Sequence, residues 1–409
     1  MHAATNSCIS LWNLSEAHFA RPAPRAHSPT ATALTSPDCT ARADGFIDMT
    51  YTLPPLATCI VRWQAQHGRN HLPWQNTRDP YRVWLSEIML QQTQVTTVLG
   101  YYERFLATLP DVASLAAAPA DQVMALWSGL GYYSRARNLH RCAQVVMAEH
   151  GGQFPRCAQA LAQLPGIGRS TAAAIAAFCF EERAAILDAN VKRVLTRVLA
   201  FEGDLAQARQ EKILWALAEQ LLPTAASDMP RYTQALMDLG ATVCVPRSPS
   251  CLLCPLQTHC QASKQGRAQE FPVKTRKTVR RSQSWWLLFL RTPHNQYWLQ
   301  RRSAQSGANA IWAGLYSPLV YASADELDSV LVNMDGFART DLPVLQHGLT
   351  HRELHLHPVV LHVTQAKQHP LPHNTDGAWW SLSDALAQGL PAPIRKLLAD
   401  VAQAGGHAD

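Results

Sequence analysis

Four cysteines lie within 17 residues of one another and form the strongest chemical signal in the chain: Cys244, Cys251, Cys254 and Cys260. Four thiolates in one short loop need a cation to offset their charge, and both zinc and a four-iron cluster suit such a set. Structural zinc usually pairs two CxxC units across a longer gap, whereas here a single CxxC lies between two outer cysteines. The spacing favours a [4Fe–4S] cluster in a closed, structural site, with zinc as the alternative.

A second signal is Glu87, an isolated acid in the largely apolar stretch Trp84–Gln94. Most helix glutamates are solvated, but the apolar neighbours predict that this one is partly buried. Burial would raise its pKa and make it a proton donor near neutral pH. Gln91 and Gln92 follow, with side chains that can pair with base edges.

A third signal is Asp188, in the segment Ile186–Val194. A helix is predicted to start just after it, so the simplest role is an N-cap. A capping carboxylate beside a DNA sugar could also stabilise a positively charged transition state. Asn190 and Lys192 are nearby candidates for DNA contacts.

The string Leu164–Thr171 holds two glycines and precedes an alanine-rich helix. Gly166 and Gly168 permit a tight turn, and the free N–H groups of the following helix can bind an anion. The pattern is typical of a helix–hairpin–helix that grips a DNA phosphate, with Arg169 and Ser170 at the helix start. An ordinary helical hairpin is the alternative.

These residues lie in a region, residues 50–262, in which apolar side chains recur at helical spacing. Asp79 and Pro80 offer an N-cap and a first helical residue. The helices are predicted over 56–65, 81–89, 95–106, 120–126, 136–148, 172–180, 191–199 and 213–221.

Residues 263–282 hold seven Lys or Arg and read as a basic linker, a solvated tether or a phosphate contact. Residues 283–400 change character, with strands predicted at 284–291, 296–302 and 358–364 and a terminal helix from Ile394. This indicates a separate α+β domain, followed by a tail over 401–409. Its seven histidines between 347 and 373 match no standard metal spacing, so strand-face and surface positions are favoured.

The composition is that of a multidomain globular protein: 409 residues, 47 % apolar, with a net charge of +6 that permits a nucleic-acid partner. Residues 1–49 are rich in Ala, Thr, Ser and Pro and are treated as a disordered or mis-assigned extension, with Met49 as the expected start. No apolar run is long enough for a membrane span. The scattered placement of the other six cysteines suits a reducing cytoplasm.

Residues 50–262 resemble the helix–hairpin–helix glycosylase superfamily with an endonuclease III-type iron–sulfur loop, and within it the MutY-type adenine DNA glycosylases. The resemblance is carried by the four cysteines, the Asp188 segment and the strings at 72–75, 81–95, 127–139, 164–172 and 235–241. It implies an all-α core that removes adenine mispaired with 8-oxoguanine or guanine from double-stranded DNA. We expect a monomer with one [4Fe–4S] cluster.

The resemblance also implies a mechanism in which the adenine is extruded from the helix. Glu87 would protonate N7 of the adenine, and Asp188 would stabilise the cationic sugar, electrostatically or through a transient covalent bond. Leu130 and Tyr132 would insert beside the lesion with Gln92 filling the gap, while Trp74 and Gln234 would line the adenine pocket. Lyase relatives carry Lys where this chain has Ser170, so no Schiff base is expected.

Residues 283–400 resemble the NUDIX-like C-terminal domain of the same family, without an acid-rich NUDIX box. By this resemblance Thr350 and His351 would contact the 8-oxoguanine. The chain departs from the family pattern at Ala189, Leu349 and Thr350, where Gly, Phe and often Ser are usual.

Two other functions fit parts of the pattern. An endonuclease III-like lyase would share the core, but Ser170 and the extra domain argue against it. A non-catalytic iron–sulfur DNA sensor would need the hairpin and the cysteines, but not Glu87 and Asp188 together.

Overall fold

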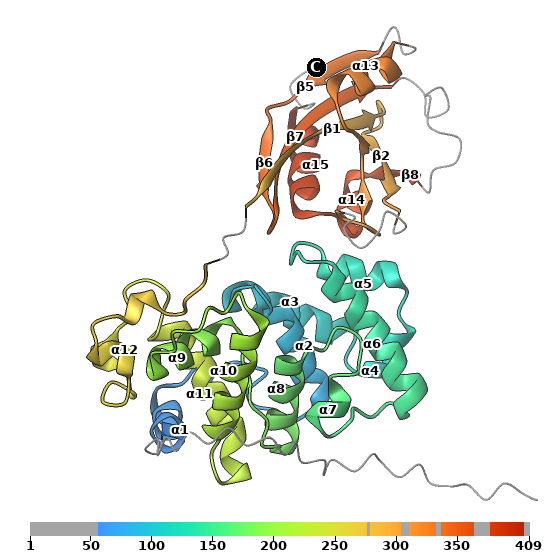
Figure 1. Ribbon diagram of the computed structural model, residues 1–409. Coiled ribbons are helices and arrows are strands. Elements are labelled where there is room, and N and C mark those ends of the chain that lie inside the picture. Colours follow the sequence, from blue (N-terminus) through green and yellow to red (C-terminus); the bar gives the residue numbers. More distant parts are fainter. Residues whose placement is uncertain (1–55, 276–278, 304–310, 333–336, 364–376, 405–409) are drawn as a thin grey trace, which may run out of the picture. The chain divides into compact units, whose positions relative to one another are not determined.

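The computed structural model describes residues 56–275, 279–303, 311–332, 337–363 and 377–404 (Figure 1). The extension 1–49 lies outside these residues. Within the described chain, no helix is both long enough and apolar enough to cross a membrane.

The first part of the chain is helical, as the apolar spacing predicts. All eight predicted helices are present, and four more were not predicted: α4, α7, α11 and α12. The helices are α1 Leu56–His67, α2 Pro80–Leu90, α3 Val95–Thr108, α4 Val112–Ala117, α5 Ala120–Trp127, α6 Ser134–His150, α7 Ala158–Leu161, α8 Arg169–Phe180, α9 Ala189–Leu199, α10 Ala208–Gln220, α11 Met229–Thr242 and α12 Gln261–Lys264.

Local sequence explains where the key helices start. The Asp79 carboxylate accepts a hydrogen bond of 2.9 Å from the N–H of Tyr81, and Pro80 is the first residue of α2, as predicted. Asp188 caps α9 by accepting a 2.7 Å hydrogen bond from the N–H of Val191. The caps therefore fix α2 and α9 at the positions from which Glu87 and Asp188 project.

Helix α11 runs through one core of the helical part and contacts α1, α8 and α9. Small residues allow this close packing. Ala172 to Ala177 of α8 are buried, and a Cβ on Gly240 of α11 would lie 2.7 Å from the Cβ of Asn190. The start of α9 is thereby held against α11.

The segment 263–282 is not a free tether over its first half. It contains the end of α12 and a 3-10 turn, Ala268–Glu270, and the Phe271 side chain is 1 % exposed. The N–H of Leu205 also donates to the carbonyl of Val273 at 3.1 Å. An apolar side chain and a backbone hydrogen bond tie these residues to the helical part, despite their basic neighbours.

The C-terminal part is a mixed sheet with helices. The sheet order is β3-β2-β1-β7-β5, with β4 paired to β1, β6 to β7 and β8 to β2. The strands are β1 Arg281–Arg291, β2 Gln296–Arg301, β3 Tyr316–Ser317, β4 Leu319–Tyr321, β5 Ala338–Asp341, β6 Leu345–Gly348, β7 Arg352–His362 and β8 Gly377–Ser381, and the helices are α13 Ala324–Leu331, α14 Leu382–Ala387 and α15 Ala392–Ala404.

Long parallel strands β1 and β7 form the centre of this sheet, in register from Arg281 opposite Arg352 to Arg291 opposite His362. Helix α13 packs on β1 and β4, and α14 packs on β2 and β8 (Figure 1). The strands predicted at 284–291 and 296–302 are present as β1 and β2, which pair antiparallel. The strand predicted from Pro358 starts at Arg352, and the terminal helix continues into the expected tail.

Five of the seven clustered histidines lie on β6, on β7 or in the turn between them, while His369 and His373 fall outside the described residues. One of them, His357, stacks on Trp286 with ring centroids 4.3 Å apart. Among the described residues, no three His, Cys, Asp or Glu side chains converge to hold a metal ion.

Candidate active site

A pocket opens in the helical part beside α2, and Glu87 lies on its wall. The walls come from the end of α1, residues 70–78, α2, α8 and the start of α11. The lining includes the predicted pocket residues together with several that were not predicted: Asn70, Trp74, Gln75, Ser86, Glu87, Phe178, Arg231 and Gln234.

Glu87 has the electrostatic character of a proton donor. Burial and, to a smaller extent, the negative charge of Asp188 together raise the pKa of its carboxyl from 4.5 to about 8. A carboxyl with this pKa holds its proton at neutral pH. The Glu87 side chain is partly buried, as predicted.

Asp188 is the helix cap expected from its position, and it lies close enough to Glu87 for the two charges to interact. Burial raises the pKa of its carboxyl. The hydrogen bonds from the backbone N–H groups of Val191 and Asn190, and the charges of Arg193 and Lys192, act in the opposite direction. Asp188 is not among the described residues that line the pocket. The two acids thus come together from helices far apart in the sequence, with different environments.

Aromatic and amide side chains form another part of the pocket lining. Trp74 is 6 % exposed and packs edge-on against Tyr102, with ring centroids 5.3 Å apart. Gln234 projects from α11 and donates a 2.8 Å hydrogen bond to Asp238. A flat aromatic face and an amide suit a planar heterocyclic base.

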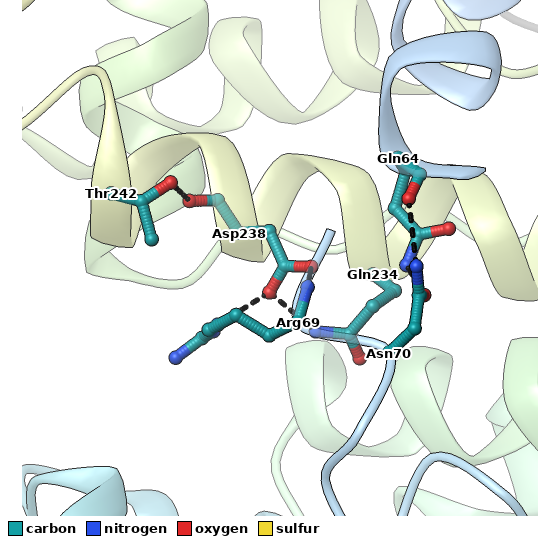
Figure 2. Close-up of polar contacts among 6 residues, drawn as sticks. All are labelled: Gln64, Arg69, Asn70, Gln234, Asp238 and Thr242. Atoms are coloured by element: carbon teal, nitrogen blue, oxygen red, sulfur yellow. Dashed lines mark hydrogen bonds and ion pairs between the residues drawn. The ribbon is translucent and has the colours of Figure 1, made fainter. Parts of the chain in front are cut away.

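Figure 2 shows the polar network behind this wall. Arg69 forms an ion pair with Asp238 at 2.7 Å, and Gln64 donates to the amide oxygen of Asn70 at 2.7 Å. These contacts fix the loop that carries Asn70 and Trp74 against α1 and α11.

Sequence reasoning missed two features of this site. Both polar atoms of the Gln75 amide are buried, and neither has a hydrogen-bond partner among the described residues. Gln75 also lines the pocket, so a polar ligand could satisfy it. Asp238 lies in the string 235–241, and a buried acid in an apolar run is the signal that could have singled it out.

Two loops carry the residues predicted to enter the DNA helix, and one arginine holds both. Nη1 of Arg135 donates to the carbonyls of Ile88, Met89 and Gln91, at 2.7 to 3.0 Å. Nη2 donates to the Thr93 hydroxyl at 3.2 Å and to the carbonyls of Leu130 and Gly131 at 3.3 and 3.2 Å.

The backbone of both loops is strained in the same way. Gln92 has φ of 57° and Tyr132 has φ of 48°, values that favour glycine. Tyr132 is 44 % exposed, whereas Leu130 is buried. Arg135 thus supports Tyr132, predicted to insert beside the lesion, and Gln92, predicted to fill the gap, in backbone conformations that need support from their surroundings.

The predicted hairpin is formed by α7, the turn through Gly168, and α8. Gly166 has φ of 77°, and a Cβ there would lie 2.6 Å from the Cβ of Asn138. The guanidinium carbon of Arg169 lies 4.0 Å from the ring centroid of Trp215, and Arg169 also forms an ion pair with Glu219.

The other predicted DNA contacts have protein partners. The Ser170 hydroxyl accepts a 3.0 Å hydrogen bond from the N–H of Leu187. Gln91 donates to the Thr171 hydroxyl at 3.3 Å. Asn190 accepts from Arg193 at 2.8 Å, and Lys192 pairs with Glu211 at 2.6 Å. These side chains hold the framework of the hairpin and α9 together.

All four clustered cysteines line one cavity between α9, the end of α11 and the loop 249–260. None forms a disulfide. Burial raises the pKa of the Cys254 thiol to about 12, and the neighbouring thiols act in the same direction. Arg197 donates to the sulfur of Cys244 at 3.4 Å. Four free thiols around one cavity, with a cation beside them, have the chemistry of a metal-cluster donor set, although no three of these described thiols lie close enough together to hold a single metal ion.

Thr350 and His351 form the turn between β6 and β7, and both are exposed. The N–H of Leu349 donates to the carbonyl of Arg352 at 2.7 Å and closes this turn, and the N–H of Arg281 donates to the carbonyl of His351. The predicted recognition residues are therefore on a short, backbone-fixed turn.

Comparisons with known proteins define the class of this fold and site. Residues 85–220 match the HhH-GPD superfamily of base excision DNA repair proteins, and residues 286–400 match a NUDIX domain. A solved thermostable thymine-DNA glycosylase is 30 % identical and covers 51 % of this chain and 95 % of its own, with a TM-score of 0.45.

Two relatives point to one group within this class. An adenine DNA glycosylase of Buchnera aphidicola is 33 % identical over 344 residues, 83 % of this chain and 95 % of the relative. An adenine DNA glycosylase of Mus musculus is 46 % identical over 213 residues, 50 % of this chain and 41 % of the relative. The chain belongs to the adenine DNA glycosylase family.

Proposed function

We propose that this protein hydrolyses the N-glycosidic bond of adenine mispaired with 8-oxoguanine or guanine in double-stranded DNA and leaves an abasic site. The observation that carries the proposal is the buried Glu87 carboxyl on the wall of a pocket lined by Trp74 and Gln234, with the Asp188 carboxylate nearby. Membership of the adenine DNA glycosylase family supports adenine as the base.

The chemistry follows from the different environments of the two acids. Glu87 transfers its proton to N7 of the extruded adenine, so the base leaves as a neutral molecule when the glycosidic bond breaks. The sugar becomes an oxocarbenium-like cation, and the Asp188 carboxylate stabilises its charge. Water then adds to the anomeric carbon and loses a proton, which completes the hydrolysis.

We further propose that the protein has no lysine-based lyase activity. A Schiff base needs an amine at the sugar. Ser170 occupies the position of the lyase lysine, and its hydroxyl is bound to the N–H of Leu187. No lysine is among the described residues that line the pocket.

The four cysteines would hold a [4Fe–4S] cluster in a structural role. The cluster would hold the loop 244–260 against α9 and take no part in base excision. Arg197 supplies a positive charge beside the site. Iron and acid-labile sulfide analysis of the purified protein tests this assignment, since zinc without sulfide would contradict it.

The C-terminal domain would recognise the 8-oxoguanine through Thr350 and His351. Their exposure on a fixed turn supports such a contact. We expect the protein to act as a monomer in the cytoplasm, associated with the nucleoid.

A single duplex assay tests the function. The substrate carries adenine opposite 8-oxoguanine, and strand breaks are measured with and without hot alkali. Breaks that need alkali support the proposal. Breaks without alkali would indicate a lyase, and an absence of breaks would indicate a DNA-binding sensor.

A Glu87→Gln variant completes the test. We expect it to keep mismatch binding and to lose base excision, because Gln cannot give up a proton to the base. Full excision by this variant would contradict the role of Glu87.

A further inference from the structure

Asp238 is a fully buried acid whose carboxylate has three donors around it. Oδ1 accepts from Nε of Arg69 at 2.7 Å and from Nε2 of Gln234 at 2.8 Å. Oδ2 accepts from the backbone N–H of Arg69 at 3.0 Å. Asp238 itself is 0 % exposed, so it makes no contact with solvent. The ion pair with Arg69 compensates its buried charge.

The carboxylate leaves Gln234 only one orientation of its amide. A carboxylate accepts hydrogen bonds and donates none, so the NH₂ group of Gln234 must face Asp238. The amide oxygen then points away from Asp238, as Figure 2 shows. Within the described chain this oxygen has no hydrogen-bond partner, and Gln234 lines the pocket.

We propose that Asp238 is a positioning residue that sets the base specificity of the pocket through Gln234. With the amide fixed in this way, its oxygen accepts a hydrogen bond from the exocyclic 6-amino group of adenine. A 6-oxopurine presents an acceptor at the same place and meets the amide oxygen with like partial charge. This inference rests on the proposed function, because it requires an adenine in the pocket.

A purely structural role for Asp238 makes a different prediction. The Asp238–Arg69 pair also ties the loop before Trp74 to α11, so its loss could disturb the whole pocket. A disturbance of that kind slows excision of every purine by a similar factor. A specificity role changes the ratio of rates between purines that have the 6-amino group and purines that lack it.

The experiment measures single-turnover excision from duplexes that carry adenine or unsubstituted purine opposite 8-oxoguanine. The variants are Asp238→Asn and Gln234→Met. Asn is the same size as Asp but can donate as well as accept, so the Gln234 amide is free to turn over. We expect the adenine-to-purine rate ratio to fall about 10-fold in each variant, the effect of one hydrogen bond to substrate.

A double variant shows whether the two residues act through one contact. Asp238→Asn combined with Gln234→Met should lower the ratio no further than Gln234→Met alone. Full additivity of the two effects would contradict the proposal.

Exchanging the carboxylate at position 238 and the amide at position 234 should restore the adenine-to-purine rate ratio. In the Asp238→Asn/Gln234→Glu variant, the Asn amide donates to the new carboxylate, which turns its second oxygen to the pocket. We expect the ratio to recover to within about 3-fold of wild type. This variant keeps one buried carboxylate, so it carries the test if Asp238→Asn alone fails to fold.

Thr242→Val is the matched control. The Thr242 hydroxyl donates to the backbone carbonyl of Asp238 at 2.8 Å, so the variant perturbs the same helix and leaves the carboxylate intact. Its ratio should stay within about 2-fold of wild type. An unchanged ratio in either Asp238→Asn or Gln234→Met overturns the inference, whereas a wild-type protein that releases no adenine overturns the proposed function instead.

Discussion

The Asp188 carboxylate lies close enough to Glu87 for its negative charge to raise the Glu87 pKa, in the same direction as burial. The two acids are 101 positions apart in the sequence. One ends up protonated at neutral pH, while the other accepts the N–H of Val191 as a helix cap. Burial raises the pKa of both carboxyls, but only Asp188 also has backbone N–H donors and the charges of Arg193 and Lys192, which favour its ionised form. One protonated and one ionised carboxyl is the arrangement by which a single site performs both acid catalysis and cation stabilisation.

The pH dependence of excision should follow the Glu87 proton. Its pKa of about 8 means that the acid form is complete below this value and is lost above it. We expect kcat/KM on a mispaired duplex to fall about tenfold per pH unit above pH 8. Measurement of kcat/KM between pH 6 and 10 checks this, and a rate that stays flat through pH 9.5 would rule Glu87 out as the proton donor.

The raised pKa of Glu87 also predicts that replacing its carboxyl group makes the folded protein more stable at high pH. The folded state binds the Glu87 proton more tightly than the unfolded chain, so Glu87 contributes stability at low pH that is lost as pH rises from about 4.5 to about 8. The loss is on the order of 4 kcal/mol once the buried carboxyl ionises. A Glu87→Gln variant avoids this loss.

We therefore expect Glu87→Gln to be more stable than wild type at pH 9 and nearly equal to it at pH 5. Urea unfolding at the two pH values measures the difference. Glu103→Gln, at an exposed position on α3, is the control and should show no such pH-dependent gain. Equal stability of Glu87→Gln and wild type at pH 9 would mean that Glu87 is hydrated in the folded protein.

The Asp188→Asn variant distinguishes the helix-capping role of Asp188 from its proposed role in stabilising the sugar cation. Asn is as good an N-cap as Asp, so the free energy of unfolding should change by less than about 1 kcal/mol. The excision rate should fall at least ~100-fold, because a neutral amide stabilises a sugar cation poorly. Thermal unfolding and single-turnover kinetics measure the two effects. An unchanged excision rate would reduce Asp188 to a helix cap.

Local sequence was sufficient for the parts of the site that depend on one segment. Glu87 stood out as a lone acid among apolar residues, and the cysteines stood out by spacing. Helix α11 was missed because it is buried on several faces, so its apolar residues do not alternate with an exposed polar side. The buried charge of Asp238 is compensated by Arg69, which is 169 positions away, and no local pattern contains that pairing.

The strands of the C-terminal part show the same limit. Strands β1 and β2 are neighbours in the sequence, and local patterns predict both. The central pairing of β1 with β7 joins residues about 70 positions apart and in parallel, and only the tertiary fold establishes it. The first half of the basic segment was likewise read from its charges, whereas the burial of Phe271 determines where it lies.

Arg135 binds the segment after α2 and the loop that carries Leu130, and it should affect the rate of base excision without contacting the base. Burial lowers the pKa of its guanidinium to about 10. Its six acceptors lie at the end of α2, in the loop after α2 and in the loop that carries Leu130. Arg135→Lys replaces a planar fork by a single ammonium that cannot reach both loops. We expect a loss of about 2 kcal/mol in unfolding free energy and slower base extrusion, measured by the fluorescence of 2-aminopurine beside the mispair.

The control for this prediction is Arg141→Lys, at an exposed position on the same helix. It should match wild type in both measurements. If Arg135→Lys lost stability but extruded the base at the wild-type rate, Arg135 would be a support for the core and not for the two loops.

The two glycines of the hairpin turn should respond differently to the same substitution. At Gly166 an added Cβ meets the Cβ of Asn138 at 2.6 Å, and φ is 77°, so Gly166→Ala strains both packing and backbone. At Gly168 nothing lies within 4 Å of the added Cβ, and φ is −84°, which any residue adopts.

We expect Gly166→Ala to cost about 1 to 3 kcal/mol of unfolding free energy, and Gly168→Ala less than about 1 kcal/mol. The affinity for undamaged duplex DNA, measured by fluorescence anisotropy, should fall in the same order, because a shifted turn moves the N–H groups at the start of α8 away from the phosphate. Equal effects of the two variants on stability and on affinity would show that the turn relaxes around Gly166, and would remove the geometric argument for an anion site at this hairpin.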